Sequence, residues 1–66
     1  SVKNKIRLEK EELLVYSCFD FYAKSIQQVQ QETGMNILQV MSYITHLCEL
    51  GMIQESFKNQ YIKIKS

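Results

Sequence analysis

Residues 33–54, TGMNILQVMSYITHLCELGMIQ, contain the helix that decides the fold. Six apolar residues in this stretch lie on one face of an α-helix, at offsets of 0, 3, 4, 7, 10 and 11 counted from Ile37. They are Ile37, Val40, Met41, Ile44, Leu47 and Cys48. Asn36 is a good N-cap, with Gln39 placed as in a capping box and Met35 placed to pack on Val40. Gly51 is typical of a helix C-terminus. The stretch therefore predicts a long helix that buries one face.

A shorter helix of about two turns is predicted just before it. Ser25 is a good N-cap, and Gln28, three residues later, completes a capping box. Ile26 and Val29 give this helix an inward edge, and Gly34 supplies the left-handed residue that ends it.

A first helix is expected over residues 9–20. Acidic residues at its start suit the positive end of a helix dipole: Glu9, Glu11 and Glu12. A stripe at helical spacing predicts its buried face: Leu8, Val15, Tyr16 and Phe19. Three further apolar residues lie partly off that stripe: Leu13, Leu14 and Cys18. They give this helix more apolar surface than one face requires, and we interpret them as facing a partner.

From Met52 onward the apolar period changes from helical spacing to two. Apolar and polar residues alternate in 52–56 (MIQES) and 60–65 (QYIKIK), and Asn59 offers a turn between them. This alternation predicts a β-hairpin with Lys63 and Lys65 pointing away from its buried face. Three helices followed by a hairpin wing define an α+β, mostly α, winged helix-turn-helix over residues 8–66, with a basic segment or linker at 1–7. A plain three-helix bundle would leave the alternation unexplained.

The charges are unevenly distributed. Between residues 25 and 57 the chain has three acids and no lysine or arginine. A recognition helix in a major groove normally offers Arg, Lys, Asn or Gln to base edges, with cations nearby for phosphates. The long helix supplies no cation, so we interpret its outer face as an interaction face for a protein: Gln39, Ser42, Tyr43 and His46.

The basic residues at the two ends of the chain suggest an alternative. If the N-terminal segment runs beside the hairpin, six cations share one side and are candidates for phosphate contacts: Lys3, Lys5, Arg7, Lys58, Lys63 and Lys65. Such a surface would bind single- or double-stranded DNA weakly, without sequence specificity and with strong salt dependence. Solubilising lysines on an edge hairpin are the simpler interpretation.

Composition and motif spacing argue against a membrane-spanning protein, a metal site and an enzyme. The 66 residues, 45% apolar and 23% charged, are typical of one small globular domain, and the chain has no apolar run that could span a membrane. His46 lacks a second metal ligand at helical spacing, and Glu11 and Glu12 fit a solvated helix start. Cys18 and Cys48 lack the spacing of a zinc site or of a disulfide framework, so we expect both to be buried free thiols. We expect a cytoplasmic domain that is not an enzyme and takes no metal or cofactor.

Several of these positions together resemble a known family, across residues 8–64. They are Leu8, Ser25, Ile26, Val29, Thr33, Gly34, Met35, Leu47, Leu50, Gly51, Met52, Ile53 and Tyr61. The pattern resembles the C-terminal winged-helix domain of the bacterial DNA-processing protein A family, DprA or Smf. Two departures are Glu9, where a capping serine or threonine is common, and a wing turn without glycine.

The resemblance implies an accessory role in a larger protein, and the start at Ser1 rather than methionine also suggests a fragment. The parent proteins have a Rossmann-like domain that binds single-stranded DNA and helps to load the recombinase RecA during natural transformation. The expected partners are then the remainder of the parent protein, a second copy, or another transformation protein. A fragment of a winged-helix transcription regulator is the alternative.

Overall fold

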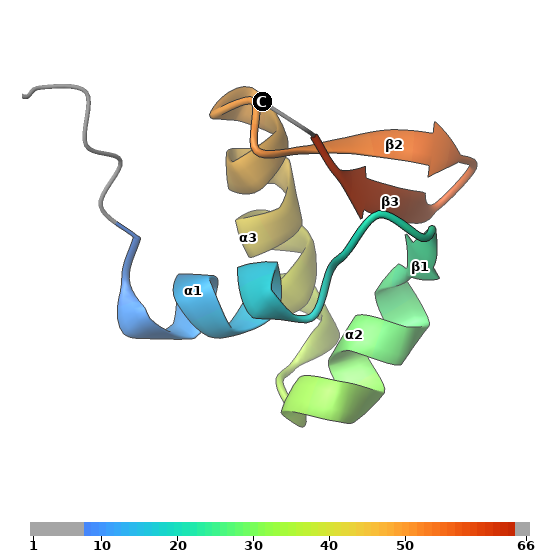
Figure 1. The fold of residues 1–66 in the computed structure, drawn as a ribbon. Helices are drawn as coiled ribbons and strands as arrows, with labels where there is room; N and C mark the ends of the chain where they lie inside the picture. The colour runs from blue at the N-terminus through green and yellow to red at the C-terminus, as the bar shows by residue number, and fades with distance from the viewer. Residues whose placement is uncertain (1–7, 65–66) are drawn as a thin grey trace, which may run out of the picture.

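Helix α3 (Ile37–Glu49) is the longest element of the part of the chain that the structure describes, and both other helices and the first strand of the hairpin pack against it. The computed structural model describes residues 8–64, in the order α1 (Lys10–Ser17), β1 (Lys24–Ser25), α2 (Ile26–Thr33), α3, β2 (Ile53–Phe57) and β3 (Gln60–Lys63). Figure 1 shows α1 lying across α3, α2 at the lower right beneath β1, and the β2–β3 hairpin projecting as a wing. The predicted α+β winged-helix arrangement is confirmed. No helix within 8–64 is long and apolar enough to cross a membrane.

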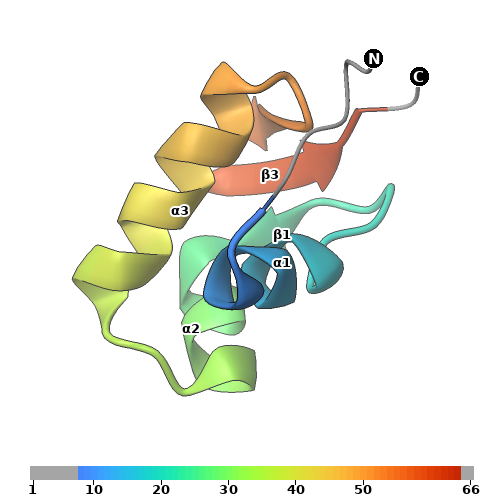
Figure 2. The same ribbon diagram turned by 90° about the vertical axis from the view of Figure 1, so that its left-hand side faces the viewer.

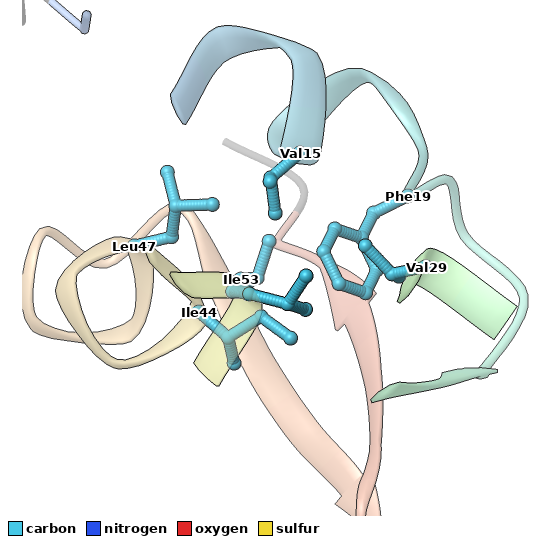
Figure 3. Packing of buried hydrophobic residues seen from close by; sticks show 7 residues of the cluster. Val15, Phe19, Val29, Ile44, Leu47 and Ile53 are labelled. Carbon is cyan, nitrogen blue, oxygen red and sulfur yellow. The ribbon is translucent and has the colours of Figure 1, made fainter. Parts of the chain in front are cut away.

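The core forms where the three helices meet the base of the wing (Figure 3). Seven buried apolar side chains compose it: Val15, Phe19, Val29, Val40, Ile44, Leu47 and Ile53. The ring of Tyr61 closes the sheet side of the core with an edge-on contact to Phe19, at a centroid distance of 6.4 Å. The predicted stripe of α3 is correct at its centre, whereas Met41 at its margin is 46% exposed. Met41 borders a hollow between the start of α2 and the wing turn, so neither element covers it.

The helix ends follow the predicted caps closely. Ser25 and Gln28 form the capping box of α2, and Gly34 ends that helix with φ of +72°. Asn36 caps α3 by accepting a hydrogen bond from the backbone N–H of Leu38 at 2.7 Å rather than from Gln39. The predicted staple at α3 agrees with Met35 packing against the core. Local chemistry therefore sets the boundaries of α2 and α3.

The sheet has three antiparallel strands in the order β1-β3-β2. Figure 2 shows β1 beside β3, directly before α2. The sequence predicts the hairpin but not β1, because β1 has only two residues and its pattern is too short to recognise. Asn59 takes the left-handed conformation in the turn, with φ of 64°, so no glycine is required there. Its N–H donates to Glu55 Oε2 at 2.8 Å, and its carbonyl accepts from the N–H of Ile26 at 3.3 Å.

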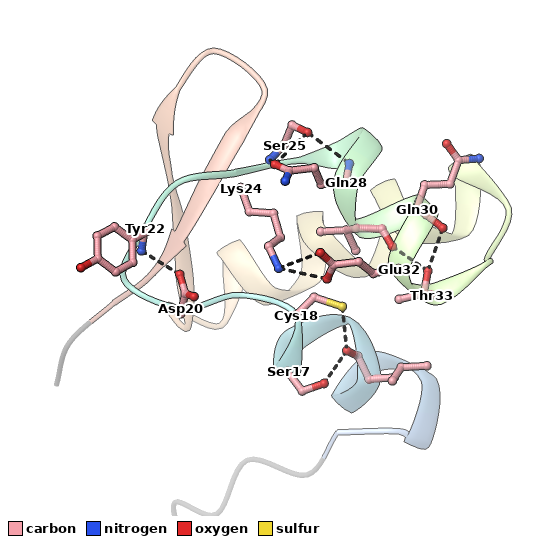
Figure 4. A network of polar contacts seen from close by, with 12 residues as sticks. Ser17, Cys18, Asp20, Tyr22, Lys24, Ser25, Gln28, Gln30, Glu32 and Thr33 are labelled. Carbon is pink, nitrogen blue, oxygen red and sulfur yellow. Dashed lines mark hydrogen bonds and ion pairs between the residues drawn. The ribbon is translucent and has the colours of Figure 1, made fainter.

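Helix α1 is shorter than the predicted range of 9–20. Glu9 occupies the N-cap position without a side-chain capping bond, and the helix ends at Ser17. The loop to β1 then lies against the sheet, since the carbonyl of Asp20 accepts from the N–H of Lys63 at 2.8 Å. The carboxylate of Asp20 accepts from the N–H of Tyr22 at 2.8 Å, which shapes the same loop (Figure 4).

Candidate interaction surfaces

The outer face of α3 is exposed and carries no lysine or arginine. Its centre is a row at helical spacing: Leu38, Ser42, Thr45 and Glu49. Leu38 is 72% exposed, and Met41 flanks it on the side of the wing turn. The sequence interpretation did not include Leu38, although its position opposite the buried stripe is the signal that marks it.

The predicted interaction face of α3 lies partly against α1. Gln39, Ser42 and His46 are exposed, but Tyr43 is half-buried and its hydroxyl donates to Glu11 Oε1 at 2.9 Å. His46 contacts the other acid of this turn, through Nδ1 to Glu12 Oε2. The outward half of α3 is therefore a smaller surface than predicted, because α1 covers the side that carries Tyr43.

The prediction that Glu11 and Glu12 form a solvated helix start is wrong for Glu12. Its side chain is buried, and Glu11 remains exposed while it bonds to Tyr43. Both contacts join residues more than 30 positions apart, so the pattern of α1 by itself does not reveal them. A shallow hollow of about 310 Å³ lies at this junction, lined by Glu9, Glu12, Ser42, Tyr43 and His46.

Glu11 and Glu12 of α1 raise the pKa values of their partners on α3, Tyr43 and His46. The hydrogen bond to Glu11 raises the pKa of Tyr43, and the hydrogen bond with Glu12 raises the pKa of His46. For His46 this effect outweighs the opposite effect of desolvation, and the charges of nearby acids reinforce it.

Helix α1 exposes the apolar residues that were predicted to face a partner. Leu13 is 53% and Leu14 48% exposed, and together with Lys10, Glu11 and Ser17 they line an open, mostly apolar hollow of about 580 Å³. The third predicted residue, Cys18, differs, because it is half-buried and packs against the core. The apolar surface of α1 therefore centres on Leu13 and Leu14.

Both cysteines are free thiols and half-buried, close to the prediction of buried thiols. The Cys18 thiol donates to the carbonyl of Leu14 at 3.5 Å. Burial raises the pKa of both thiols, so at neutral pH the reactive thiolate is disfavoured at Cys18 and at Cys48. Neither cysteine has the environment of an activated nucleophile.

The predicted phosphate-contacting cations are only partly brought together. Lys58 is exposed in the wing turn. Lys63 is half-buried and does not simply point away from the protein, because its Nζ lies 4.4 Å from the ring centroid of Tyr16. The remaining four lie outside the described residues: Lys3, Lys5, Arg7 and Lys65. Within 8–64, the wing thus presents one exposed cation, Lys58.

A second cation near the wing is already paired. Lys24 in β1 donates to both carboxylate oxygens of Glu32, at 3.0 and 3.2 Å (Figure 4). The side chain of Lys24 is only 18% exposed, so this ion pair holds it against α2. Lys24 therefore adds little to any phosphate-binding surface.

The geometry defines a small winged-helix domain whose exposed surfaces on α1 and α3 are apolar and polar rather than basic. Among residues 8–64 no three His, Cys, Asp or Glu side chains are grouped so that they could hold a metal ion. No family model, curated protein or solved structure matches this chain.

Proposed function

We propose that this winged-helix domain is a non-catalytic protein-interaction module, accessory to a larger DNA-processing protein of the DprA type and acting in the cytoplasm. The observation that carries the proposal is the outer face of α3, which exposes Leu38 and lacks lysine and arginine. Affinity for DNA comes largely from cations placed against phosphates, whereas exposed apolar side chains gain free energy mainly by burial against protein. The resemblance of residues 8–64 to the DprA winged-helix domain supports the wider assignment.

The second contact surface in this proposal is α1. Leu13 and Leu14 stand next to each other and are about half exposed, with Lys10 and Glu11 beside them. An apolar centre with a charged margin is typical of a protein interface. The occupant we propose is the remainder of the parent protein, because a domain attached to its partner needs only a small interface at high effective concentration.

A second candidate function is weak, sequence-independent DNA binding through the wing. The exposed position of Lys58 favours it. The pairing of Lys24 with Glu32 and the position of Lys63 over Tyr16 weigh against a strong basic patch. The residues at 1–7 and Lys65 belong to this alternative and are tested with it.

The two functions differ in an amide chemical-shift titration of the chain with short single- and double-stranded DNA. We expect no shifts along α3 from Gln39 to His46 at any salt concentration, because this face has no cation for a phosphate. Accessory DNA binding would give shifts only near Lys58, Lys63 and the N-terminus, and these would disappear with added salt. Large, sequence-dependent shifts from Gln39 to His46 would contradict the proposed function.

Sedimentation at increasing protein concentration distinguishes the parent protein from a second copy as the partner. We expect a monomer for the separate chain. A reversible dimer that is lost in a Leu13→Ser, Leu14→Ser variant, and kept in the control variant Leu38→Ser, would instead identify a second copy on α1.

A further inference from the structure

Glu12 is a buried acid at the junction of two helices. It lies in the first turn of α1 and is 3% exposed, yet a carboxylate is costly to bury without a compensating charge. Its Oε2 contacts Nδ1 of His46 on α3, whose side chain is 50% exposed. Of the two ion pairs found within residues 8–64, this one links α1 to α3, and the other joins Lys24 and Glu32.

The groups around this contact are predominantly acidic. Glu9 of α1 lines the same hollow as Glu12 and His46, and Glu11 is bonded to the neighbouring Tyr43. Glu49 lies one turn further along α3, and its charge also favours the protonated imidazole. The lysine of α1, Lys10, lines the separate hollow beside Leu13 and Leu14. Among residues 8–64, the imidazole is therefore the group placed to compensate the Glu12 charge.

We propose that Glu12 and His46 form a protonation-dependent clamp, in which the imidazolium of His46 compensates the buried Glu12 carboxylate and fastens α1 to α3. The contact beside it, from the Tyr43 hydroxyl to Glu11, joins the same two helices, and the raised pKa of Tyr43 keeps its hydroxyl protonated near neutral pH. The clamp thus adds a pH-dependent contact to a pH-independent one.

The direction of the pH dependence follows from the shift of His46. Its pKa in the folded protein is raised above the ordinary value of 6.5, mainly by the hydrogen bond with Glu12. A raised pKa means that the folded state binds the proton more tightly than the unfolded chain does. The stabilisation is therefore fully present below pH 6.5 and is lost as the pH rises through the folded-state pKa. Mildly acidic conditions tighten α1 against α3.

The clamp has a consequence for the surfaces described above. Because α1 carries Leu13 and Leu14 while α3 carries Leu38, the clamp fixes how the two apolar surfaces are oriented to each other. This consequence rests on the proposed function. The clamp itself does not rest on the proposed function, and it is measured without any partner. A failure of the clamp can therefore be distinguished from a failure of the proposed function.

The direct test is the titration of the single histidine of the chain, followed by the imidazole resonances in NMR. We expect a pKa above 6.5 in the wild-type protein and a fall toward 6.5 in Glu12→Gln, which keeps the size of the side chain and removes its charge. The control is Glu49→Gln, which removes a neighbouring charge without the direct contact and is expected to cause a smaller fall. A wild-type pKa at or below 6.5, or one that Glu12→Gln leaves unchanged, would overturn the clamp.

Thermal melts between about pH 5.5 and 8.5, on either side of the usual histidine range, give an independent readout. Between the acidic and the alkaline end of this range, the melting temperature of the wild-type protein should fall by several degrees more than that of Glu12→Gln. The variant His46→Lys keeps a cation over the whole pH range, so its melting temperature should not show this additional fall compared with Glu12→Gln. Parallel curves of melting temperature against pH for the wild-type protein and Glu12→Gln would exclude a protonation-dependent contact. If a variant fails to fold, the titration of the wild-type histidine still tests the clamp.

Discussion

Substitution of Ile44 by aspartate is expected to unfold the domain. Ile44 lies near the middle of α3 and is 2% exposed, in the same core cluster as Val15, Val29 and Ile53. The aspartate would lose the apolar contacts of the isoleucine, about 2 to 5 kcal/mol for a large core side chain, and would place an unpaired carboxylate in the core. A domain of 66 residues has a total stability of roughly 3 to 10 kcal/mol. The combined loss is comparable with the whole stability.

Circular dichroism during a thermal melt at neutral pH measures this effect. We expect Ile44→Asp to show no cooperative transition and a reduced helical signal at room temperature. The matched control is Thr45→Asp, which introduces the same residue at the next, exposed position of α3 and should change stability by about 0.5 kcal/mol or less. A cooperative melt in Ile44→Asp would mean that α3 buries a different face.

The sequence predicts α2 and α3 well because local interactions define them. The capping box of Ser25, the cap at Asn36 and the left-handed residues Gly34 and Gly51 involve neighbours within a few positions. The turn at Asn59 is equally local, since Asn tolerates a positive φ through its short polar side chain. Such features are visible in a single sequence.

Features that depend on tertiary packing are harder to predict. The burial of Glu12 arises because His46, 34 positions away, is brought against α1, and a charged residue in a first turn is otherwise expected to be solvated. Strand β1 exists because β3 pairs with it, since Lys24 and Ser25 have no strand pattern of their own. These features require the arrangement of the whole domain.

The candidate surfaces depend partly on local pattern and partly on tertiary packing, so the sequence predicts them only in part. The apolar pattern identifies which face of α3 is buried, but it does not say how far its neighbours extend over the margins. The sequence predicts that Met41 is buried, yet it is 46% exposed, and that Tyr43 lies on the outer face, yet α1 partly covers it. The absence of cations from α3 was readable from the sequence alone, and it carries the proposed function.

Replacement of Gly51 by valine is expected to destabilise the domain by about 1 to 3 kcal/mol, the usual cost of holding a non-glycine residue in a sparsely populated backbone region. Gly51 has φ of +77° and ends α3, where its N–H donates to the carbonyl of Cys48 at 3.0 Å. The N–H of Met52 donates to the carbonyl of Leu47 at 3.0 Å, which completes a Schellman motif. This turn directs the chain from α3 into β2, so strain there affects both elements.

The backbone conformation, rather than a steric clash, is the expected cause of that loss. Apart from Gly51 itself and its two neighbours in the chain, no heavy atom of the described residues lies within 4 Å of the position that a Cβ on Gly51 would occupy. Alanine should therefore destabilise less than valine, and asparagine least of the three, because asparagine tolerates the left-handed region and β-branched residues resist it. Urea denaturation of the three variants measures this order directly. Equal stability of Gly51→Val and the wild-type protein would show that the end of α3 adopts another conformation in solution.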